Sequence, residues 1–541
     1  PNSGFRYADF IYDSKRERLI CVREDHGGQD SLEFAASKVS NCLVSLPIGE
    51  AIVTDGEVLF SDSDFVSSPT LSADASTLAF IWWDHPNMPW DITTLAVASL
   101  TDEGYFSEVT HVQGPCPASI LQPRFNGDRQ LYVISDWSGW WNIYRYDLSR
   151  STDSAEPVNV CPLRAEACSA QWQLGKYNYD FGLDGSIAVS ICSEGRWSLL
   201  HISAEAEQAT HQGDRSYETI LDGFGHIDSL SVSGETLYFC GATSTELPGV
   251  YSVFLPSGSG NGRELIPERF IGAVTKLTRA SISRPINIEF DTGENEKAYA
   301  FFYPPTNSHV KTEDGDKPPL IVGVHGGPTS AARAVLNLKV QFWTSRGFAF
   351  LDVNHRGSTG WGRQYRHRLY QGWGIVDIED IENGVRHVID KGFVAPDRIA
   401  IRGGSAGGYS VMACLANSEL FSAGASYYGI SDLEILAQET HKFEAHYLDS
   451  LIGPLPETKS RYIERSPINK IRNISAPLLL LQGLEDKVVP PSQAELICNK
   501  LQRQGTEVTY LTFSDEGHGF RQSKNQIRAL NAELDFYLKY L

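Results

Sequence analysis

One serine, Ser405, lies in a setting that could make it a nucleophile. Residues 403–407 have the sequence Gly-Gly-Ser-Ala-Gly, a G-x-S-x-G pattern that follows the apolar run 399–401 and precedes a helical segment. Between a strand and a helix this pattern is typical of a nucleophile elbow, a strained turn that lifts the hydroxyl above the sheet. The helix that follows directs backbone N–H groups and the positive end of its dipole toward developing negative charge. We therefore predict that Ser405 attacks a carbonyl carbon.

A serine hydroxyl needs a base, and behind an elbow of this kind an acid and then a histidine follow the serine, each after a later strand. The apolar run 478–481 leads to Asp486, which we predict to be the acid, with its neighbour Glu485 as the alternative. His518 lies between two glycines directly after the β-type run 508–513, and we predict that it is the general base. Asp486 would orient the imidazole of His518 and stabilise its protonated form.

A second glycine-rich loop could stabilise the negative charge that such an attack creates. The apolar run 319–324 ends in His325, two glycines and a proline, and a loop in this position supplies a donor to an oxyanion hole. We predict that the backbone N–H groups of Gly327 and Ala406 bind the oxyanion. His325 is expected to shape the loop. The remaining histidines form no metal-binding pattern, so we expect neither a metal nor another cofactor.

The elements that must position these residues are visible in the second half of the chain. From about residue 285, apolar strands alternate with helix-length amphipathic segments, a pattern typical of a mostly parallel sheet with helices on both faces. We expect strands at 320–324, 349–353, 399–401, 424–428, 478–481 and 508–513, and helices at 375–391 and 409–417. The fold class is therefore α/β, with an α/β-hydrolase domain over residues 276–541.

The first half of the chain is composed of short β-type runs separated by turns. Related segments recur about every 50 residues, each with a polar turn followed by a strand rich in aromatic and β-branched residues. Copies begin near residues 9, 68, 122, 184 and 233. This repetition predicts an all-β propeller domain of about five blades over residues 1–275, and a β-sandwich is the alternative.

Length and charge restrict the class of protein further. A chain of 541 residues exceeds what one hydrophobic core usually organises. A formal net charge of −21 argues against nucleic-acid and membrane partners, because both would be repelled. Nine cysteines are scattered without close pairs, which favours a reducing, cytoplasmic location. We expect no membrane span and no export signal, and a homo-oligomer is compatible with the sequence.

Together these motifs resemble the prolyl oligopeptidase family of serine peptidases, especially its acylaminoacyl-peptidase and dipeptidyl-aminopeptidase-like branches. The resemblance rests on the 325–328 loop, residues 352–362, the elbow and the two loops with Asp486 and His518. It implies a propeller that admits short peptides to the active site and excludes folded proteins. Relatives of this branch begin roughly a hundred residues earlier, so we expect the first blades to be absent, through truncation, cleavage or an incomplete propeller.

The expected function is hydrolysis of short peptides through an acyl-enzyme intermediate. One alternative is an esterase, amidase or acyl transferase that acts on a small metabolite, because the same three residues serve all acyl chemistry. Another is a propeller-based binding protein without catalysis. Ester and peptide anilide substrates would separate the first two classes.

Substrate contacts are the least constrained part of the site, because folding brings pocket walls together from distant segments. Tyr427, Tyr428 and Phe443 follow the elbow and could line an apolar pocket, although aromatic residues more often belong to the core. Two pairs of carboxylates in the first half could bind a substrate amino terminus or could be solvated loop residues. These are Glu24 with Asp25, and Asp84 with Asp91.

Overall fold

The computed structural model describes residues 4–27, 39–49, 54–112, 114–127, 129–148, 156–204, 217–255, 265–310 and 315–541. The chain divides into two compact units. The first comprises Pro1–Ala242, Pro248–Ala273 and Gly360–Arg363, and the second comprises Thr243–Leu247, Val274–Thr359 and Gln364–Leu541.

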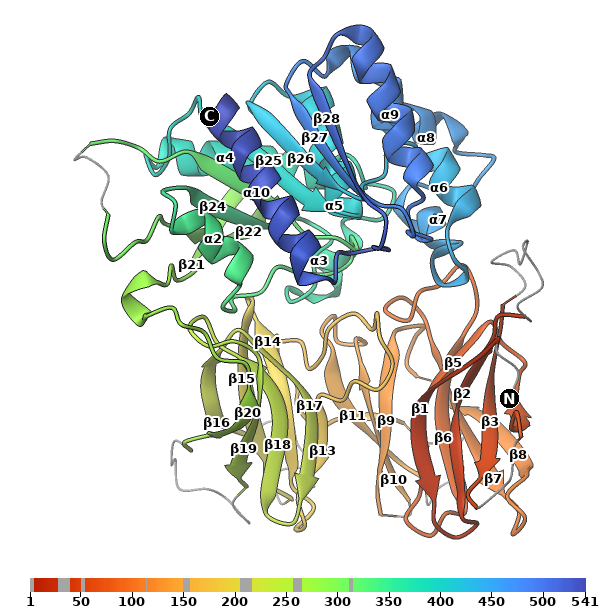
Figure 1. Ribbon diagram of the computed structural model, residues 1–541. Helices are drawn as coiled ribbons and strands as arrows, with labels where there is room; N and C mark the ends of the chain where they lie inside the picture. The colour runs from red at the N-terminus through yellow and green to blue at the C-terminus, as the bar shows by residue number, and fades with distance from the viewer. Residues whose placement is uncertain are drawn as a thin grey trace. The chain divides into compact units, whose positions relative to one another are not determined.

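The described part of the first unit contains five antiparallel sheets of four strands, and within each sheet consecutive strands pair (Figure 1). The sheets are β1 (Phe5–Asp13), β2 (Arg18–Asp25), β3 (Ser40–Pro47) and β4 (Glu57–Phe60); β5 (Phe65–Leu71), β6 (Thr77–Trp83), β7 (Thr94–Leu100) and β8 (Phe106–Val112); β9 (Ile120–Asn126), β10 (Gln130–Ser135), β11 (Asn142–Asp147) and β12 (Val158–Asn159); β13 (Tyr179–Phe181), β14 (Ile187–Ser193), β15 (Arg196–Ile202) and β16 (Tyr217–Phe224); and β17 (His226–Ser233), β18 (Thr236–Ala242), β19 (Gly249–Phe254) and β20 (Glu268–Gly272).

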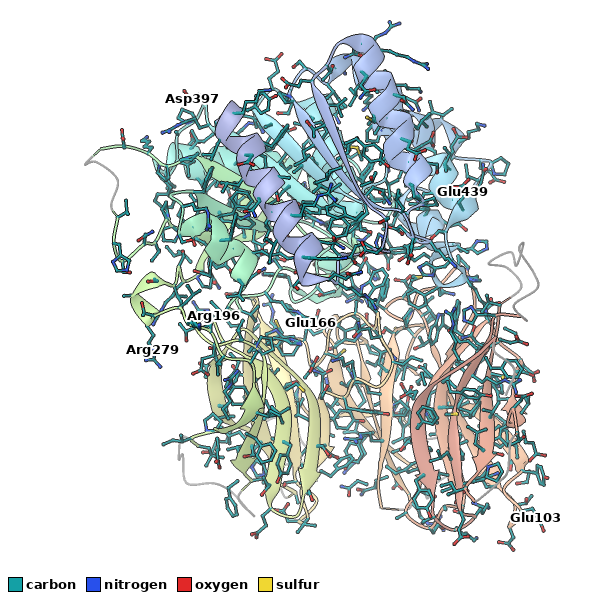
Figure 2. All side chains as sticks on the ribbon, viewed as in Figure 1. Glu103, Glu166, Arg196, Arg279, Asp397 and Glu439 are labelled. Carbon is teal, nitrogen blue, oxygen red and sulfur yellow. The ribbon has the colours of Figure 1, made fainter. Side chains whose placement is uncertain are left out.

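Inner strands of these sheets bury successive side chains. Leu78, Ala79 and Phe80 of β6 are each fully buried. Because side chains alternate between the two faces of a strand, such burial requires that both faces of the sheet are covered. Glu166, labelled in Figure 2, is also fully buried and accepts a hydrogen bond of 2.8 Å from the backbone N–H of Trp141. Four-stranded meanders covered on both faces are the blades of a β-propeller.

The second unit is organised on one eight-stranded sheet with the strand order β21-β22-β24-β23-β25-β26-β27-β28. β21 pairs antiparallel with β22, and β22 pairs antiparallel with β24, whereas the six strands from β24 to β28 in this order are parallel. The strands are β21 (Ile286–Thr292), β22 (Glu296–Tyr303), β23 (Leu320–Val324), β24 (Ala349–Asn354), β25 (Ile399–Gly404), β26 (Ala423–Tyr427), β27 (Leu478–Gly483) and β28 (Val508–Phe513).

Helices cover both faces of this sheet (Figure 1). Trp343 and Tyr537 bring α2 and α10 together over one face, with ring centroids 5.6 Å apart. Leu351 of β24 and Gly424 of β26 face the opposite side, where they meet α4 and α5. The helices are α2 (Leu338–Thr344), α3 (Gly362–His367), α4 (Val376–Asp390), α5 (Ala406–Asn417), α6 (Leu433–Glu439), α7 (Tyr447–Leu451), α8 (Lys459–Arg465), α9 (Pro491–Gln504) and α10 (Ser523–Tyr540). No helix within the described ranges is long and apolar enough to cross a membrane.

The fold class predicted from the sequence, a propeller followed by an α/β-hydrolase domain, is confirmed, and the β-sandwich alternative is wrong. The six predicted strands of the hydrolase sheet are present within a few residues of their expected bounds. The sequence pattern did not predict the antiparallel pair β21 and β22. The predicted helix after Ser405 began at residue 409, whereas α5 begins at Ala406. Gly407 and Gly408 have low helix propensity, and this obscured the first turn of the helix.

Candidate active site

The backbone of Ser405 forms the strained turn that its sequence context predicts. Ser405 lies between β25 and α5 with φ 58° and ψ −124°, in a region that costs a non-glycine residue about 1–3 kcal/mol. Two hydrogen bonds hold it there. The Ser405 N–H donates to the carbonyl of Tyr427 on β26 at 3.0 Å, and the Ser405 carbonyl accepts from the Tyr409 N–H at 3.0 Å. The side chain is therefore presented at the carboxyl end of the parallel strands.

Glycines surround this turn because the backbones approach too closely for side chains. A Cβ on Gly407 would lie 2.3 Å from the carbonyl oxygen of Val324 on β23. A Cβ on Gly403 would lie 2.4 Å from the carbonyl oxygen of Gly407. The glycines of the G-x-S-x-G pattern are thus required by the close packing of α5 against β23 and β25, as well as by the turn itself.

Asp486 and His518 form a hydrogen-bonded pair at the ends of β27 and β28. His518 Nδ1 lies 2.8 Å from Asp486 Oδ2. The other carboxylate oxygen accepts hydrogen bonds of 2.9 Å from the backbone N–H groups of Val488 and Val489. Because an ionised carboxylate only accepts hydrogen bonds, Nδ1 of a neutral His518 carries the proton and Nε2 is the proton acceptor. Glu485, the alternative acid, is exposed.

The Asp486 side chain is fully buried, whereas the His518 side chain is 24% exposed. Tyr428 lies against the imidazole, with ring centroids 4.8 Å apart at 60°. Among the described residues, no hydrogen bond joins the Ser405 hydroxyl to His518; such bonds are often long without substrate and tighten when it binds. The imidazole is thus held from two sides, by a carboxylate and by an aromatic ring.

Ser405, Ala406 and Gly327 line the same pocket. Gly327 follows β23 and has φ 122°, a conformation that favours glycine. Ala406 is the first residue of α5. Their backbone N–H groups come from the two positions from which this fold draws its oxyanion donors.

His325 stabilises the loop that carries Gly327. Its Nδ1 lies 2.9 Å from the Gly326 carbonyl, its Nε2 lies 2.8 Å from Ser358 Oγ, and its ring stacks on His355 with centroids 4.6 Å apart. Burial, with the neighbouring His355, lowers the pKa of His325 to about 3. His325 is therefore neutral near pH 7, and both of its nitrogens are used in holding the loop.

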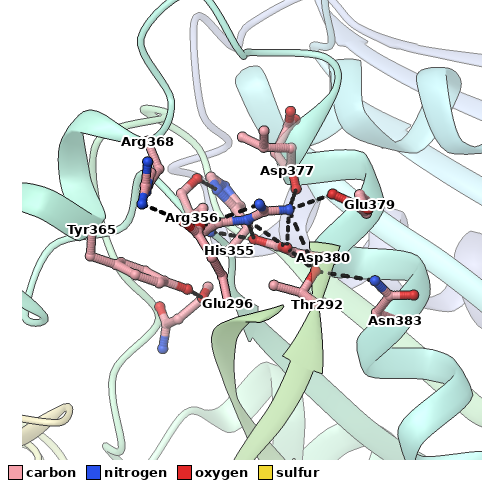
Figure 3. A network of polar contacts seen from close by, with 12 residues as sticks. Thr292, Glu296, His355, Arg356, Tyr365, Arg368, Asp377, Glu379, Asp380 and Asn383 are labelled. Atoms are coloured by element: carbon pink, nitrogen blue, oxygen red, sulfur yellow. Dashed lines mark hydrogen bonds and ion pairs between the residues drawn. The ribbon is translucent and has the colours of Figure 1, made fainter. Parts of the chain in front are cut away.

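A polar network fixes the segment on which His325 rests (Figure 3). The guanidinium of Arg356 binds Asp380 and Glu379 of α4, with Nε 3.0 Å from Asp380 Oδ1 and a terminal nitrogen 2.6 Å from Glu379. Thr292 at the end of β21 donates to Asp380 at 2.6 Å. Burial raises the pKa of Asp380 to about 6, although Arg356 opposes the shift. His355, which stacks on His325, is the neighbour of Arg356 and is anchored through it.

A pocket lies beside Ser405. Its walls are mostly apolar and come from Trp373, from Ile430, and from the short helices α6 and α7 that lie between β26 and β27. These residues could not be recognised from the sequence, because nothing in their local pattern distinguishes them from ordinary helix positions.

The three aromatic residues suggested as substrate contacts are not among the residues that line this pocket. Tyr427 is buried, and its hydroxyl donates to Glu533 at 2.5 Å. Tyr428 lies against His518, as described above. Phe443 is half-buried beside His441, with ring centroids 6.4 Å apart. Within the described ranges, no group of three or more His, Cys, Asp or Glu side chains is arranged to hold a metal ion.

A propeller unit, and an α/β-hydrolase unit with a serine at its elbow, define a two-domain serine hydrolase. Residues 334–541 match the prolyl oligopeptidase family. A puromycin-hydrolysing peptidase from Mycobacterium tuberculosis is 36% identical, with a TM-score of 0.91 over 100% of this chain and 80% of that one. This chain belongs to the prolyl oligopeptidase family of serine peptidases, as its motifs predict.

Other relatives extend the comparison. The crystal structure of a puromycin hydrolase is 32% identical, with a TM-score of 0.89 over 100% of this chain and 79% of that one. Dipeptidyl aminopeptidase BIII from Pseudoxanthomonas mexicana is 30% identical over 286 residues, 50% of this chain and 41% of that protein. An acylamino-acid-releasing enzyme from Arabidopsis thaliana is 31% identical over 39% of this chain and 29% of that enzyme. The match thus spans less than half the length of these curated relatives.

Proposed function

We propose that this chain hydrolyses amide bonds in short peptides and small aminoacyl amides through an acyl-enzyme intermediate. The observation that carries the proposal is the hydrogen bond between Asp486 and His518, at the same edge of the sheet as the strained turn of Ser405. Ser405 Oγ attacks the carbonyl carbon while His518 Nε2 accepts its proton, and Asp486 stabilises the imidazolium. His518 then returns the proton to the leaving amine, and water releases the acyl group by the reverse sequence.

The oxyanion of each tetrahedral intermediate accepts hydrogen bonds from the N–H groups of Gly327 and Ala406. Loss of one such donor typically costs about 3 kcal/mol of transition-state stabilisation. The apolar pocket next to Ser405 receives the side chain on the acyl side of the cleaved bond, because it adjoins Ser405 and its walls are mostly apolar.

The names of the relatives support a substrate with its scissile amide near an amino end. They include a dipeptidyl aminopeptidase, an acylamino-acid-releasing enzyme and puromycin hydrolases. The puromycin hydrolases favour a second candidate within the same chemistry, an amidase for a small aminoacyl amide. We include puromycin itself among the proposed substrates.

Kinetic comparison of the wild type with Ser405→Ala tests the proposal. The substrates are an acyl-peptide anilide, a peptide anilide with a free amino end, puromycin and a nitrophenyl ester, each measured as kcat/KM. Cleavage of amides by the wild type and not by the variant supports the peptidase. Ester turnover without amide cleavage would replace it with an esterase, and equal rates in both proteins would exclude Ser405.

Two proposals concern the chain as a whole. We infer a domain boundary near residue 275, which the division of the units between Ala273 and Val274 supports. We also infer a cytoplasmic location, supported by nine cysteines that are all free thiols. Retention of activity in a strong thiol reductant tests the second inference, because a secreted relative with structural disulfides would lose stability.

A further inference from the structure

A second cavity lies on the α2 side of the hydrolase sheet, at the carboxyl ends of β23, β25 and β26. Its volume is about 440 Å³, and its wall combines residues of these strands and of β24 with residues of α2 and of the segment before it. β23 leads to β24 on one side of the strand order, whereas β25 leads to β26 on the other. In open α/β sheets, ligands bind at the carboxyl ends of the strands where the order reverses in this way. The cavity therefore lies where the topology favours a ligand.

Two hydrogen-bond donors in the cavity wall have no partner within the described ranges. They are the ammonium group of Lys339, on α2, and the hydroxyl of Tyr428, directly after β26. Lys339 is exposed, and the Tyr428 hydroxyl is not sealed from solvent, so a ligand can reach both groups. Both residues also line an adjoining hollow together with Arg402, which places them at the same end of the cavity.

The charges in the cavity wall leave the Lys339 ammonium uncompensated. Burial and the neighbouring positive charge of Arg402 lower the pKa of Lys339. Glu533 opposes this shift, but its carboxylate is bound to Arg402. Asp352 is the one carboxylic acid among the residues of the wall, all of which are described, and burial raises its pKa to about 7. Because Arg333 also belongs to the wall, positive charge exceeds negative charge there.

A carboxylate ligand fits these groups. It only accepts hydrogen bonds, and the bonds that an ammonium or a phenol donates to it are charge-assisted and about twice as strong as neutral ones. Its single negative charge matches the single uncompensated ammonium, whereas a dianion such as phosphate would be repelled more strongly by the ionised fraction of Asp352. We propose that the cavity binds a carboxylate group, with the Lys339 ammonium and the Tyr428 hydroxyl as its donors.

Two sources supply such a carboxylate. Tyr428 lies against the imidazole of His518, with ring centroids 4.8 Å apart, and in the proposed function His518 returns its proton to the leaving amine. A short leaving group therefore departs beside Tyr428, and its terminal carboxylate is the first source; this assignment rests on the proposed function. The second source is a free organic carboxylate from solution, which requires no catalysis. Both present the same chemical group to Lys339.

Binding to the inactive variant Ser405→Ala tests the site itself. Isothermal titration calorimetry compares 3-phenylpropionate with 3-phenylpropionamide, and trialanine with its amide. At least one acid should bind about tenfold or more tightly than its amide, because the amide carries no charge. Addition of Lys339→Met, which keeps the apolar stem, should abolish this preference, and Tyr428→Phe should lower it severalfold. Lys391→Met, at an exposed position after α4 on the opposite face of the sheet, is the matched control and should retain it.

Steady-state kinetics of the wild type then separates the two sources. If kcat/KM is about tenfold higher for trialanine than for its amide, and Lys339→Met removes the difference, the leaving group is the source. Equal kcat/KM with selective binding of 3-phenylpropionate assigns the site to a free carboxylate. No preference for either acid, or a preference that survives Lys339→Met in a protein with a native circular dichroism spectrum, would overturn the inference. Selective binding in a protein whose wild type cleaves no amide would refute the proposed function and retain the carboxylate site.

Discussion

Arg402 and Glu533 form a two-bonded ion pair between β25, the strand that precedes the turn at Ser405, and the C-terminal helix α10. Arg402 Nε lies 2.7 Å from Oε1 of Glu533, and a terminal nitrogen of Arg402 lies 3.1 Å from Oε2. Glu533 is fully buried and also accepts the hydroxyl of Tyr427. The strand that ends in Ser405 is therefore tied to a helix more than a hundred residues later in the chain.

Removal of Glu533 should destabilise the hydrolase unit. Glu533→Ala leaves the Arg402 guanidinium buried without its partner, and the free energy of unfolding should fall by about 3–5 kcal/mol. Urea unfolding followed by tryptophan fluorescence measures the change. Glu507→Ala is the control, because its carboxylate pairs with Lys539 at the surface, and its unfolding midpoint should match the wild type. Equal midpoints for all three proteins would contradict the assigned role of the buried pair.

Substitution of Asp486 should abolish most activity without unfolding the chain. Asp486→Asn retains the shape of the side chain but no longer imposes the tautomer in which His518 Nδ1 donates, and kcat should fall by about 10⁴-fold. Glu485→Gln, one residue earlier and exposed, should retain wild-type kcat. Steady-state kinetics on a peptide anilide, with circular dichroism to check folding, decides between the two carboxylates. If Glu485→Gln lost activity and Asp486→Asn did not, Glu485 would be the catalytic acid in place of Asp486.

Asp352 should make stability depend on pH. Burial raises its pKa to about 7, and the nearby charge of Arg402 opposes this shift. An unfolded aspartate titrates near pH ~3.9, so between about pH 4 and 7 the folded chain binds a proton that the unfolded chain lacks, and stability falls as pH rises.

Asp352→Asn removes this penalty. We expect its free energy of unfolding to exceed that of the wild type by about 1–3 kcal/mol at pH 8, and by less at pH 4.5. Chemical denaturation at the two pH values measures the difference. A loss of stability that is equal at both values would show that ionisation of Asp352 carries no cost.

The glycines near the active site should differ in their tolerance of alanine. In Gly407→Ala the new Cβ would meet the Val324 carbonyl at 2.3 Å, and the required shift should cost about 1–3 kcal/mol of stability and displace Ser405. A Cβ on Gly517 finds its nearest neighbour at 3.6 Å, an ordinary contact. Gly517→Ala should therefore unfold at the wild-type midpoint. Thermal unfolding and fluorophosphonate labelling of Ser405 compare the variants, and normal labelling of Gly407→Ala would refute the packing argument.

Local sequence patterns were sufficient to predict the turn at Ser405 and most hydrolase strands, and they selected Asp486 and His518, which the structure brings within hydrogen-bond distance. Ser405, Asp486 and His518 each follow a buried strand of the parallel sheet, so the apolar run before each residue marks its place. The same reasoning found the blades from their repeated turns. The strands, the turns and the residues at strand ends can be predicted because each is determined by the hydrophobic pattern of a short stretch of sequence.

The pocket could not be predicted in this way. Trp373, Thr440 and Glu444 lie on segments that only the sheet order brings beside Ser405, and their immediate neighbours give no sign of it. Tyr427 was selected for its type and its position after the elbow, yet its hydroxyl is engaged by Glu533 from a helix that begins about a hundred residues later in the chain. Contacts between such distant segments depend on the order of the strands in the sheet. The local pattern of one segment carries no information about that order.

The placement of the pocket walls has a consequence for how this scaffold can change. The residues proposed to react lie at strand ends, whereas much of the wall belongs to residues 430–451 between β26 and β27. Under the proposed function, selectivity and chemistry are therefore encoded in separate stretches of the gene. A library confined to this one stretch, or its exchange between homologues, would diversify the accepted side chains and leave the reaction centre intact.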